Sequence, residues 1–323
     1  MQGVMLGGHG RYDPPLMDVH LIDGTFELFR YHHAPRNDDP ERGAVRGVLR
    51  SMVWLLEEGG PGPDTPVTHL GVATDHVIES FRNDLWPAYK SSAGLPPELL
   101  AQFEPLEEAL RALGLVVWPM VEYEADDALA AAAAQAAADA RVRRVVIATP
   151  DKDLGQCVVY DRVVQWDRMR DVVRDAAGVL AKTGVAPASI PDWLALVGDS
   201  ADGFPGLPGF GAKTAARLLR RFGHLDAVPE DPSVWGEGIR GAGRLAKTLG
   251  EARELVDLFR TLATLVTDLD LGTTVNDLAW TGPTADFPLV CAAYDAPDLV
   301  DRVAALVAAR AAPGVALPPS APL

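Results

Sequence analysis

Three carboxylates stand within four residues at Glu124-Ala125-Asp126-Asp127, directly before an alanine-rich stretch, 128–140, that is typical of a helix. Glu124 and Asp127 are three residues apart, so they share one face of that helix. Two like charges about 4 Å apart repel by roughly 4 kcal/mol at the effective dielectric of a protein surface. The cluster therefore needs a counter-charge. The alternative is a solvated acidic helix start, which the helix dipole favours.

Further aspartates follow apolar runs that are typical of buried parallel strands. Residues 18–23 end in Asp23, residues 68–75 end in Asp75, and residues 142–149 lead into Asp151 and Asp153. Strands that alternate with helices over 17–170 predict an α/β domain with a mostly parallel sheet. Ligands of such sheets bind beyond the carboxyl ends of the strands. We therefore expect these acids to converge with the 124–127 cluster on one edge.

Helical segments with glycine-rich joints follow residue 175. A predicted helix at 191–198 precedes Asp199 and Asp202, whose spacing again places two carboxylates on one face. The glycine-rich stretch 206–215 follows no strand, so we reject a dinucleotide site. Between two helices such a hairpin exposes backbone N–H groups at a helix start, which suits a phosphate. Lys213 adds local positive charge there.

Composition limits the class of protein. The chain has 323 residues, 48% of them hydrophobic, and a net charge of −16, which argues against a nonspecific polyanion binder. Cys157 and Cys291 provide neither a disulfide framework nor a zinc site. The first 16 residues lack the apolar core of a signal peptide, and the longest apolar run is too short to span a bilayer. We expect a soluble, cytoplasmic protein without a membrane partner.

The order and spacing of the motifs resemble the 5′ nuclease superfamily, which includes flap endonucleases and the 5′-3′ exonuclease domain of bacterial DNA polymerase I. The motifs read LIDG, VATD, SFRNDLWPAYK, EADD, TPDKDL and GDSADGFPGLPGFGAKTA. The resemblance implies a PIN-like α/β nuclease domain followed by a helix-hairpin-helix region. That region would grip duplex DNA through its phosphates, with K⁺ as an expected ion. We expect a free-standing nuclease.

The resemblance also implies roles for individual residues. Arg82 and Lys90 match catalytic residues that contact the scissile phosphate. Asp23, Asp75, Glu124, Asp126, Asp127, Asp151, Asp153, Asp199 and Asp202 match metal-site acids. Tyr89, Gly206, Gly209, Gly211, Lys213 and Thr214 match nucleic-acid contacts.

Two Mg²⁺ or Mn²⁺ ions would bind these acids and hydrolyse phosphodiester bonds near the 5′ end of DNA. We expect the acids of 124–127 and 151–153 to lie closest to the ions. Asp23 and Asp75 would act through waters, and Asp199 and Asp202 would hold the second ion more weakly. The predicted substrates are flaps, nicks and duplex ends met in DNA repair and replication, with RNA primers as a further substrate. The expected oligomeric state is a monomer.

The sequence also predicts domain boundaries: a disordered lead-in at 1–16, the nuclease domain at 17–183 and the DNA-binding region at 184–275. A segment at 276–310 would pack back on the core, ahead of a disordered tail at 311–323. Two positions depart from the family pattern, because Ala93 replaces a basic residue and Gly203 an asparagine.

Two other functions remain as alternatives. A smaller PIN-type ribonuclease shares the acidic sheet edge, although that class lacks the 206–215 hairpin and the Asp199/Asp202 pair. A catalytically silent DNA-binding module would use the acids only to hold a structural cation, although so many acids favour chemistry.

Overall fold

The computed structural model describes residues 16–62 and 65–311. Its centre is a six-stranded sheet in the order β3-β2-β1-β4-β5-β6. The strands are β1 (Met17–Asp23), β2 (His69–Asp75), β3 (Val116–Met120), β4 (Val142–Ala148), β5 (Val163–Asp167) and β6 (Val172–Arg174). Strands β1 to β5 pair in parallel, and β6 pairs antiparallel with β5. The predicted α/β class with a mostly parallel sheet is confirmed.

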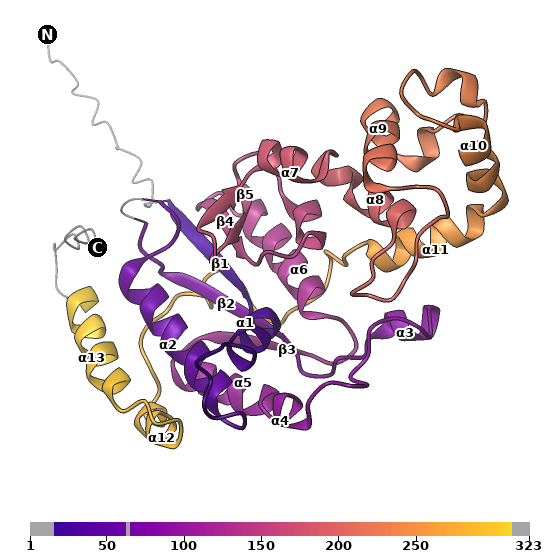
Figure 1. Ribbon diagram of the computed structural model, residues 1–323. Helices are drawn as coiled ribbons and strands as arrows, with labels where there is room; N and C mark the ends of the chain where they lie inside the picture. Colours follow the sequence, from indigo (N-terminus) through magenta and orange to yellow (C-terminus); the bar gives the residue numbers. More distant parts are fainter. Residues whose placement is uncertain (1–15, 63–64, 312–323) are drawn as a thin grey trace, which may run out of the picture.

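Helices cover both faces of this sheet (Figure 1). One face carries α1 (Gly24–His32), α2 (Gly43–Glu58), α4 (Pro97–Leu100) and α5 (Phe103–Ala112). The other face carries α6 (Ala125–Ala138), most of whose alanines are buried with Leu129 on the side that contacts β1 and β4. Small side chains allow α6 to lie close to the sheet, which keeps its first turn near the strand ends.

Two segments differ from what their sequence predicts. Residues 99–113 are typical of one helix, but the structure interrupts it at Ala101 and Gln102, and the buried Gln102 amide donates to the Pro40 and Glu98 carbonyls. Residues 158–160 and 163–166 are typical of a hairpin, but only a single bridge between Val159 and Val163 is present. Strand β5 pairs antiparallel with β6 instead.

A second group of helices lies at one end of the molecule (Figure 1). Its members are α8 (Ile190–Val197), α9 (Ala212–Phe222), α10 (Ala242–Glu251) and α11 (Arg253–Ala263). Helix α7 (Ala176–Thr183) contacts β6 at the sheet. Short 3-10 turns are η1 (Asp153–Cys157), η2 (Pro187–Ser189), η3 (Leu225–Ala227) and η4 (Pro232–Val234). The group has its own core, which includes Leu194, Leu218 and Phe259. The short helix α3 (Phe81–Leu85) follows β2 in the chain and contacts α11.

The last two helices, α12 (Phe287–Ala293) and α13 (Asp298–Ala311), return to the sheet domain. Leu299 and Val303 belong to the same buried core as α2, and Arg50 pairs with Asp298 across the surface. Most of the predicted disordered lead-in, 1–16, and tail, 311–323, lies outside the described residues. Among residues 16–62 and 65–311, every helix is too short or too polar to cross a bilayer.

The packing of α13 on α2 predicts a large effect for Leu299→Ala. Leu299 is 0% exposed, so the truncation leaves a cavity and should lower the free energy of unfolding by about 2–5 kcal/mol. Leu289→Ala is the matched control, because Leu289 is 72% exposed and its loss should change stability by less than about 0.5 kcal/mol. Urea unfolding of both variants measures the difference. Equal effects would mean that α13 does not contribute to the core.

Candidate metal centre

Adjacent strand ends bring the first acids together. Asp23 ends β1 and caps α1, because its Oδ1 accepts a hydrogen bond from Phe26 N at 2.8 Å. Asp75 ends β2, and its Oδ1 accepts from Ala125 N at 2.7 Å, which ties the strand end to the first residue of α6. Burial raises the pKa of Asp126, one residue further, and the nearby charges of Asp151, Asp23 and Asp75 add to this effect. The predicted convergence of strand-end acids is therefore present.

The turn after β4 contributes the next two acids. Thr149 Oγ1 donates to Asp23 Oδ2 at 2.8 Å and accepts from Asp151 N at 3.2 Å, so one threonine joins the ends of β1 and β4. Asp151 Oδ1 in turn accepts from Asp153 N at 2.9 Å. The buried Gln165 amide donates to the Asp151 carbonyl, and Lys182 Nζ donates to the Pro150 carbonyl at 3.2 Å. These contacts fix the turn.

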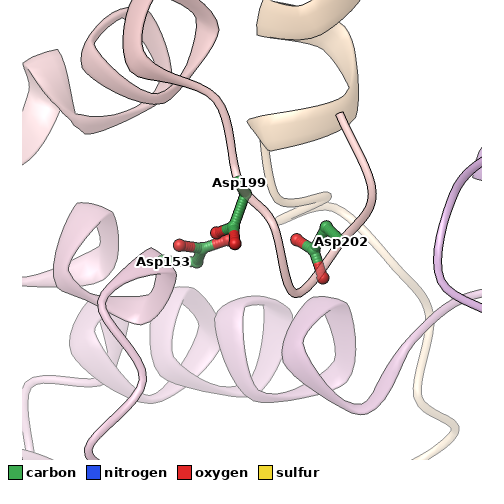
Figure 2. Close-up of side chains that lie close together, drawn as sticks. All are labelled: Asp153, Asp199 and Asp202. Atoms are coloured by element: carbon green, nitrogen blue, oxygen red, sulfur yellow. The ribbon is translucent and has the colours of Figure 1, made fainter. Parts of the chain in front are cut away.

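Asp153 meets two acids from the helical group. One carboxylate oxygen from each of Asp153, Asp199 and Asp202 lies within 4.8 Å of the others, and Figure 2 shows the three side chains gathered at one point. Lys152 Nζ pairs with Asp199 and lies 3.7 Å from Asp153 Oδ1. Asp153 Oδ1 is buried and has no hydrogen-bond partner among the described residues. An open, buried carboxylate oxygen beside two other acids is a ready ligand for a cation.

The turn that carries Asp199 and Asp202 is docked on the segment before Lys90. Trp86 Nε1 donates to the Gly203 carbonyl at 3.0 Å, and Lys90 N donates to the Asp202 carbonyl at 3.1 Å. Gly203 has φ +80°, and a Cβ there would lie 2.1 Å from the Ala88 carbonyl oxygen. The glycine at position 203 therefore has a structural reason, since a side chain would push the two segments apart.

Lys90 and Glu124 form the main charge pair of the site. Lys90 Nζ lies 2.6 Å from Glu124 Oε2, and Ser80 Oγ donates to Glu124 Oε1 at 2.8 Å. Burial alone would lower the pKa of Lys90, but Asp75 and Glu124 raise it well above its ordinary value. Burial would raise the pKa of Glu124, but the charges of Lys90 and Arg82 hold it below its ordinary value. The pair is therefore ionised at neutral pH.

The other acids are harder to ionise. Burial, with the charges of Asp75 and Asp151 nearby, raises the pKa of Asp23 to about 7. Burial and the neighbouring Asp199 raise that of Asp202 to about 6. The pKa values of Asp75, Asp126 and Asp153 are raised as well, with burial as the first cause in each case. A divalent cation would remove this cost, and oxygen-only donors suit Mg²⁺ or Mn²⁺.

Three residues predicted from the resemblance occupy positions that differ from the expected ones. The Arg82 side chain is 1% exposed and pairs with Asp127, which is 0% exposed, so neither faces the open part of the site. The Tyr89 ring is buried, and its hydroxyl lies 3.5 Å from Glu124 Oε2. Direct phosphate contact by Arg82, metal ligation by Asp127 and a nucleic-acid contact by Tyr89 would each require these groups to leave their partners.

The predicted hairpin separates into buried and exposed parts. Gly206 is buried, and a Cβ there would lie 2.3 Å from Gly198 N, so it shapes the loop. Gly209, Gly211 and Lys213 are exposed, and Thr214 is half-buried. Gly211 is the N-cap of α9 and gives no side-chain hydrogen bond to it. The start of α9 thus presents backbone amides beside an exposed lysine.

Sequence reasoning missed several supporting residues. Lys152 stands inside the TPDKDL motif, so its charge between Asp151 and Asp153 was a visible signal. Gln165 and Lys182 hold the same turn from β5 and α7, and only their contacts reveal that role. Ser80, the first residue of the SFRNDLWPAYK motif, caps α3 and also donates to Glu124.

The raised pKa values predict how the metal-free chain responds to pH. The native pKa values of Asp23, about 7, and Asp202, about 6, exceed the value near 3.9 of an unfolded aspartate. The native state therefore binds more protons than the unfolded state between about pH 4 and 7, so stability must fall as pH rises through that interval. In EDTA we expect the melting temperature to drop by roughly 5 °C between about pH 5.5 and 7.5.

Adding Mn²⁺ at the higher pH should restore most of this loss, because the cation binds the ionised native carboxylates. A melting temperature in EDTA that stays constant or rises over the same interval would contradict the raised pKa values of these buried acids.

Comparisons with known proteins agree with this geometry. A family model described as the 5′-3′ exonuclease N-terminal resolvase-like domain matches residues 18–184, and the 5′-3′ exonuclease C-terminal SAM fold matches residues 185–286. The 5′-3′ exonuclease of Buchnera aphidicola is 30% identical over 270 residues, covering 81% of this chain and 86% of that protein. DNA polymerase I of Rhizobium leguminosarum is 38% identical over 259 residues, or 78% of this chain.

The chain spans only 25% of that polymerase. Among solved structures, the T5 D15 protein crystallised with metal ions gives a TM-score of 0.59 at 18% identity, covering 88% of this chain and 99% of that one. The catalytic core of Rad2 in complex with DNA substrate gives 0.57 at 15%, with coverages of 90% and 92%. These likenesses confirm the predicted fold, a resolvase-like sheet domain followed by a helical domain. The chain therefore belongs to the 5′-3′ exonuclease family and is a nuclease.

Proposed function

We propose that this nuclease is a divalent-metal-dependent 5′-3′ exonuclease and flap endonuclease that hydrolyses DNA by a two-metal mechanism. The observation that carries the proposal is the gathering of carboxylates whose charges repel one another, among them one buried oxygen, Asp153 Oδ1, that accepts no hydrogen bond from the described residues. The proposed metal ligands are Asp23, Asp75, Glu124, Asp126, Asp151, Asp153, Asp199 and Asp202.

The acids form two overlapping groups, which supports two ions. Asp153, Asp199 and Asp202 make one group, with oxygens within 4.8 Å of one another. The second group consists of Asp126 together with Asp151, Asp23 and Asp75, whose charges act on Asp126. Asp151 belongs to both, because its charge also acts on Asp153 and Asp202. When bound, a pair of Mg²⁺ or Mn²⁺ ions activates the attacking water and stabilises the leaving oxygen.

Lys90 has the properties of a phosphate-orienting residue. Its ammonium group stays protonated at neutral pH and its side chain is 25% exposed, so it can donate to a phosphate oxygen at the mouth of the site. Lys152, whose side chain is 34% exposed and pairs with Asp199, offers a second cation beside the acids. Both amines also reduce the repulsion among the carboxylates before substrate binds.

DNA binding is proposed for the helical group. The exposed Gly209, Gly211 and Lys213, with Thr214, lie at the start of α9, where backbone amides suit a phosphate, and K⁺ could complete this site. The solved T5 flap endonuclease complex contains DNA and metal ions, and the Rad2 core was solved with DNA substrate. Both structures support DNA as the substrate that we propose for this chain. We assign nuclease chemistry to 17–183, DNA binding to 184–275 and core support to 276–310.

We propose 5′ flaps, nicks and duplex ends as the substrates, RNA primers as a further substrate, and a cytoplasmic monomer as the working form. Product mapping on 5′-labelled flapped, nicked, gapped and blunt duplexes, beside a single-stranded RNA, tests this assignment. Cleavage that requires Mg²⁺ or Mn²⁺ and releases 5′ fragments supports it. Cleavage of the RNA alone would instead favour a PIN-type ribonuclease.

Asp126→Asn should abolish cleavage while leaving affinity for duplex DNA within about threefold. The amide keeps the side-chain shape but removes one negative charge from the metal site, and losing a metal ligand lowers the rate of the chemical step. Single-turnover cleavage and fluorescence anisotropy measure the two effects. Normal cleavage by this variant in Mg²⁺ would show that the metal site is misassigned.

Lys213→Ala is the complementary control, because Lys213 is exposed on α9, outside the acidic cluster. Its loss should weaken DNA binding and reduce the salt dependence by about one phosphate contact. The rate at saturating DNA should stay near that of the wild type.

A further inference from the structure

We propose that Arg82 and Asp127 form a buried positioning pair that holds the metal-bearing start of α6 against the segment following α11. This inference rests on the proposed function, because it assigns a role within that same site. In this role the two residues position other side chains and contact neither the phosphate nor a metal ion.

Arg82 has a partner for each of its donor groups. An arginine side chain carries five N–H donors in a planar fork. Nε donates to the Leu262 carbonyl at 2.8 Å. One terminal nitrogen donates to Asp127 Oδ2 at 2.7 Å and to Glu124 Oε1 at 3.1 Å. The other donates to Asp127 Oδ1 at 2.8 Å and to the Thr264 carbonyl at 3.0 Å. The guanidinium is therefore fully engaged.

Asp127 is saturated in the same way. Each of its oxygens accepts one bond from Arg82 and one from a backbone amide, Glu124 N at 3.0 Å on Oδ2 and Val266 N at 2.9 Å on Oδ1. A carboxylate has about four lone-pair positions, and all of them are used here. Asp153, by contrast, has one buried oxygen that accepts no hydrogen bond from the described residues and lies 3.7 Å from Lys152 Nζ. This contrast separates a structural acid from a ligand.

The pair connects three parts of the chain. Arg82 lies on α3, Asp127 lies in the first turn of α6, and the carbonyls and amide come from residues 262–266, at and after the end of α11. Asp127 fixes the backbone of Glu124, and Arg82 fixes its side chain. Glu124 in turn holds Lys90 Nζ at 2.6 Å. Moving this pair would therefore move Glu124, Asp126 and the partner of Lys90 together.

Only arginine can satisfy this arrangement, because its rigid fork donates in several directions at once. A lysine keeps the charge but has one nitrogen, so it must leave some of these buried acceptors unpaired. Arg82→Lys consequently separates geometry from charge. A phosphate-contacting or purely electrostatic Arg82 would tolerate the change far better than a positioning Arg82.

The test measures Mn²⁺ binding to the DNA-free protein by electron paramagnetic resonance, well below each variant's melting temperature. Arg82→Lys should weaken Mn²⁺ binding by about 10–100-fold, the usual effect of losing a residue that orients metal ligands. At saturating Mn²⁺, kcat on a 5′-flapped duplex should fall about tenfold or more, while KM for DNA stays within about threefold.

Asp18→Asn is the matched control. Asp18 is also a buried carboxylate held by two arginines, Arg143 and Arg144, but it stands at the opposite end of β1 from Asp23. Its loss should lower the melting temperature without changing Mn²⁺ affinity. An equal loss of Mn²⁺ affinity in this control would overturn the inference, because general destabilisation would then explain the effect.

The double variant Arg82→Met/Asp127→Leu provides a folded comparison if Arg82→Lys fails to fold, because apolar replacement of a buried ion pair is often neutral for stability. It should also bind Mn²⁺ weakly. Mn²⁺ affinity equal to wild type in either variant, or a change confined to KM, would overturn the positioning role. Wild-type protein that binds Mn²⁺ but cuts no 5′-labelled DNA would refute the proposed function alone.

Discussion

Mutual repulsion among buried carboxylates is the constraint on which the rest of this structure depends. Acids from β1, β2, the turn after β4, the start of α6 and the turn after α8 lie close enough to raise one another's pKa values. The fold keeps these carboxylates close together through contacts from several elements. Parallel strands align their carboxyl ends, and Lys90 and Lys152 supply compensating charge. A bound cation pair would complete the compensation.

Hydrogen-bond saturation distinguishes the acids more clearly than burial does. Asp127 is fully buried and has every lone pair engaged, while Asp153 is buried with one oxygen open. Asp23 and Asp75 are intermediate. Asp23 accepts from Phe26 N and from the Thr149 hydroxyl, and Asp75 accepts from Ala125 N, which fixes the direction of each carboxylate without using all of its lone pairs. The same residue type thus serves as a clamp, as an orienting cap and as a proposed metal ligand within one site, according to how many of its lone pairs accept hydrogen bonds.

The sequence predicted the parts of this arrangement that follow from periodicity. Apolar runs ending in Asp23 and Asp75 fixed the strand ends, and parallel pairing then required those acids to share an edge. The burial of Arg82 could not be predicted in this way, because its partners at Leu262 and Thr264 lie about 180 residues away in the chain. For the same reason the EADD motif alone could not show whether the oxygens of Asp127 face a cation or an arginine. Gly203 departs from the family pattern, and only the structure gives the reason, because a Cβ at this position would clash with the Ala88 carbonyl oxygen.

Anomalous diffraction from crystals of the full chain soaked in Mn²⁺ tests the central claim most directly. The account predicts two manganese peaks at the carboxyl edge of the sheet, one bound by Asp153 and its neighbours Asp199 and Asp202, the other beside Asp126 and Asp23. Asp127 should remain paired with Arg82 and contact neither ion. Absence of manganese among these carboxylates, or peaks only elsewhere on the surface, would contradict the assignment of this edge as the catalytic metal centre.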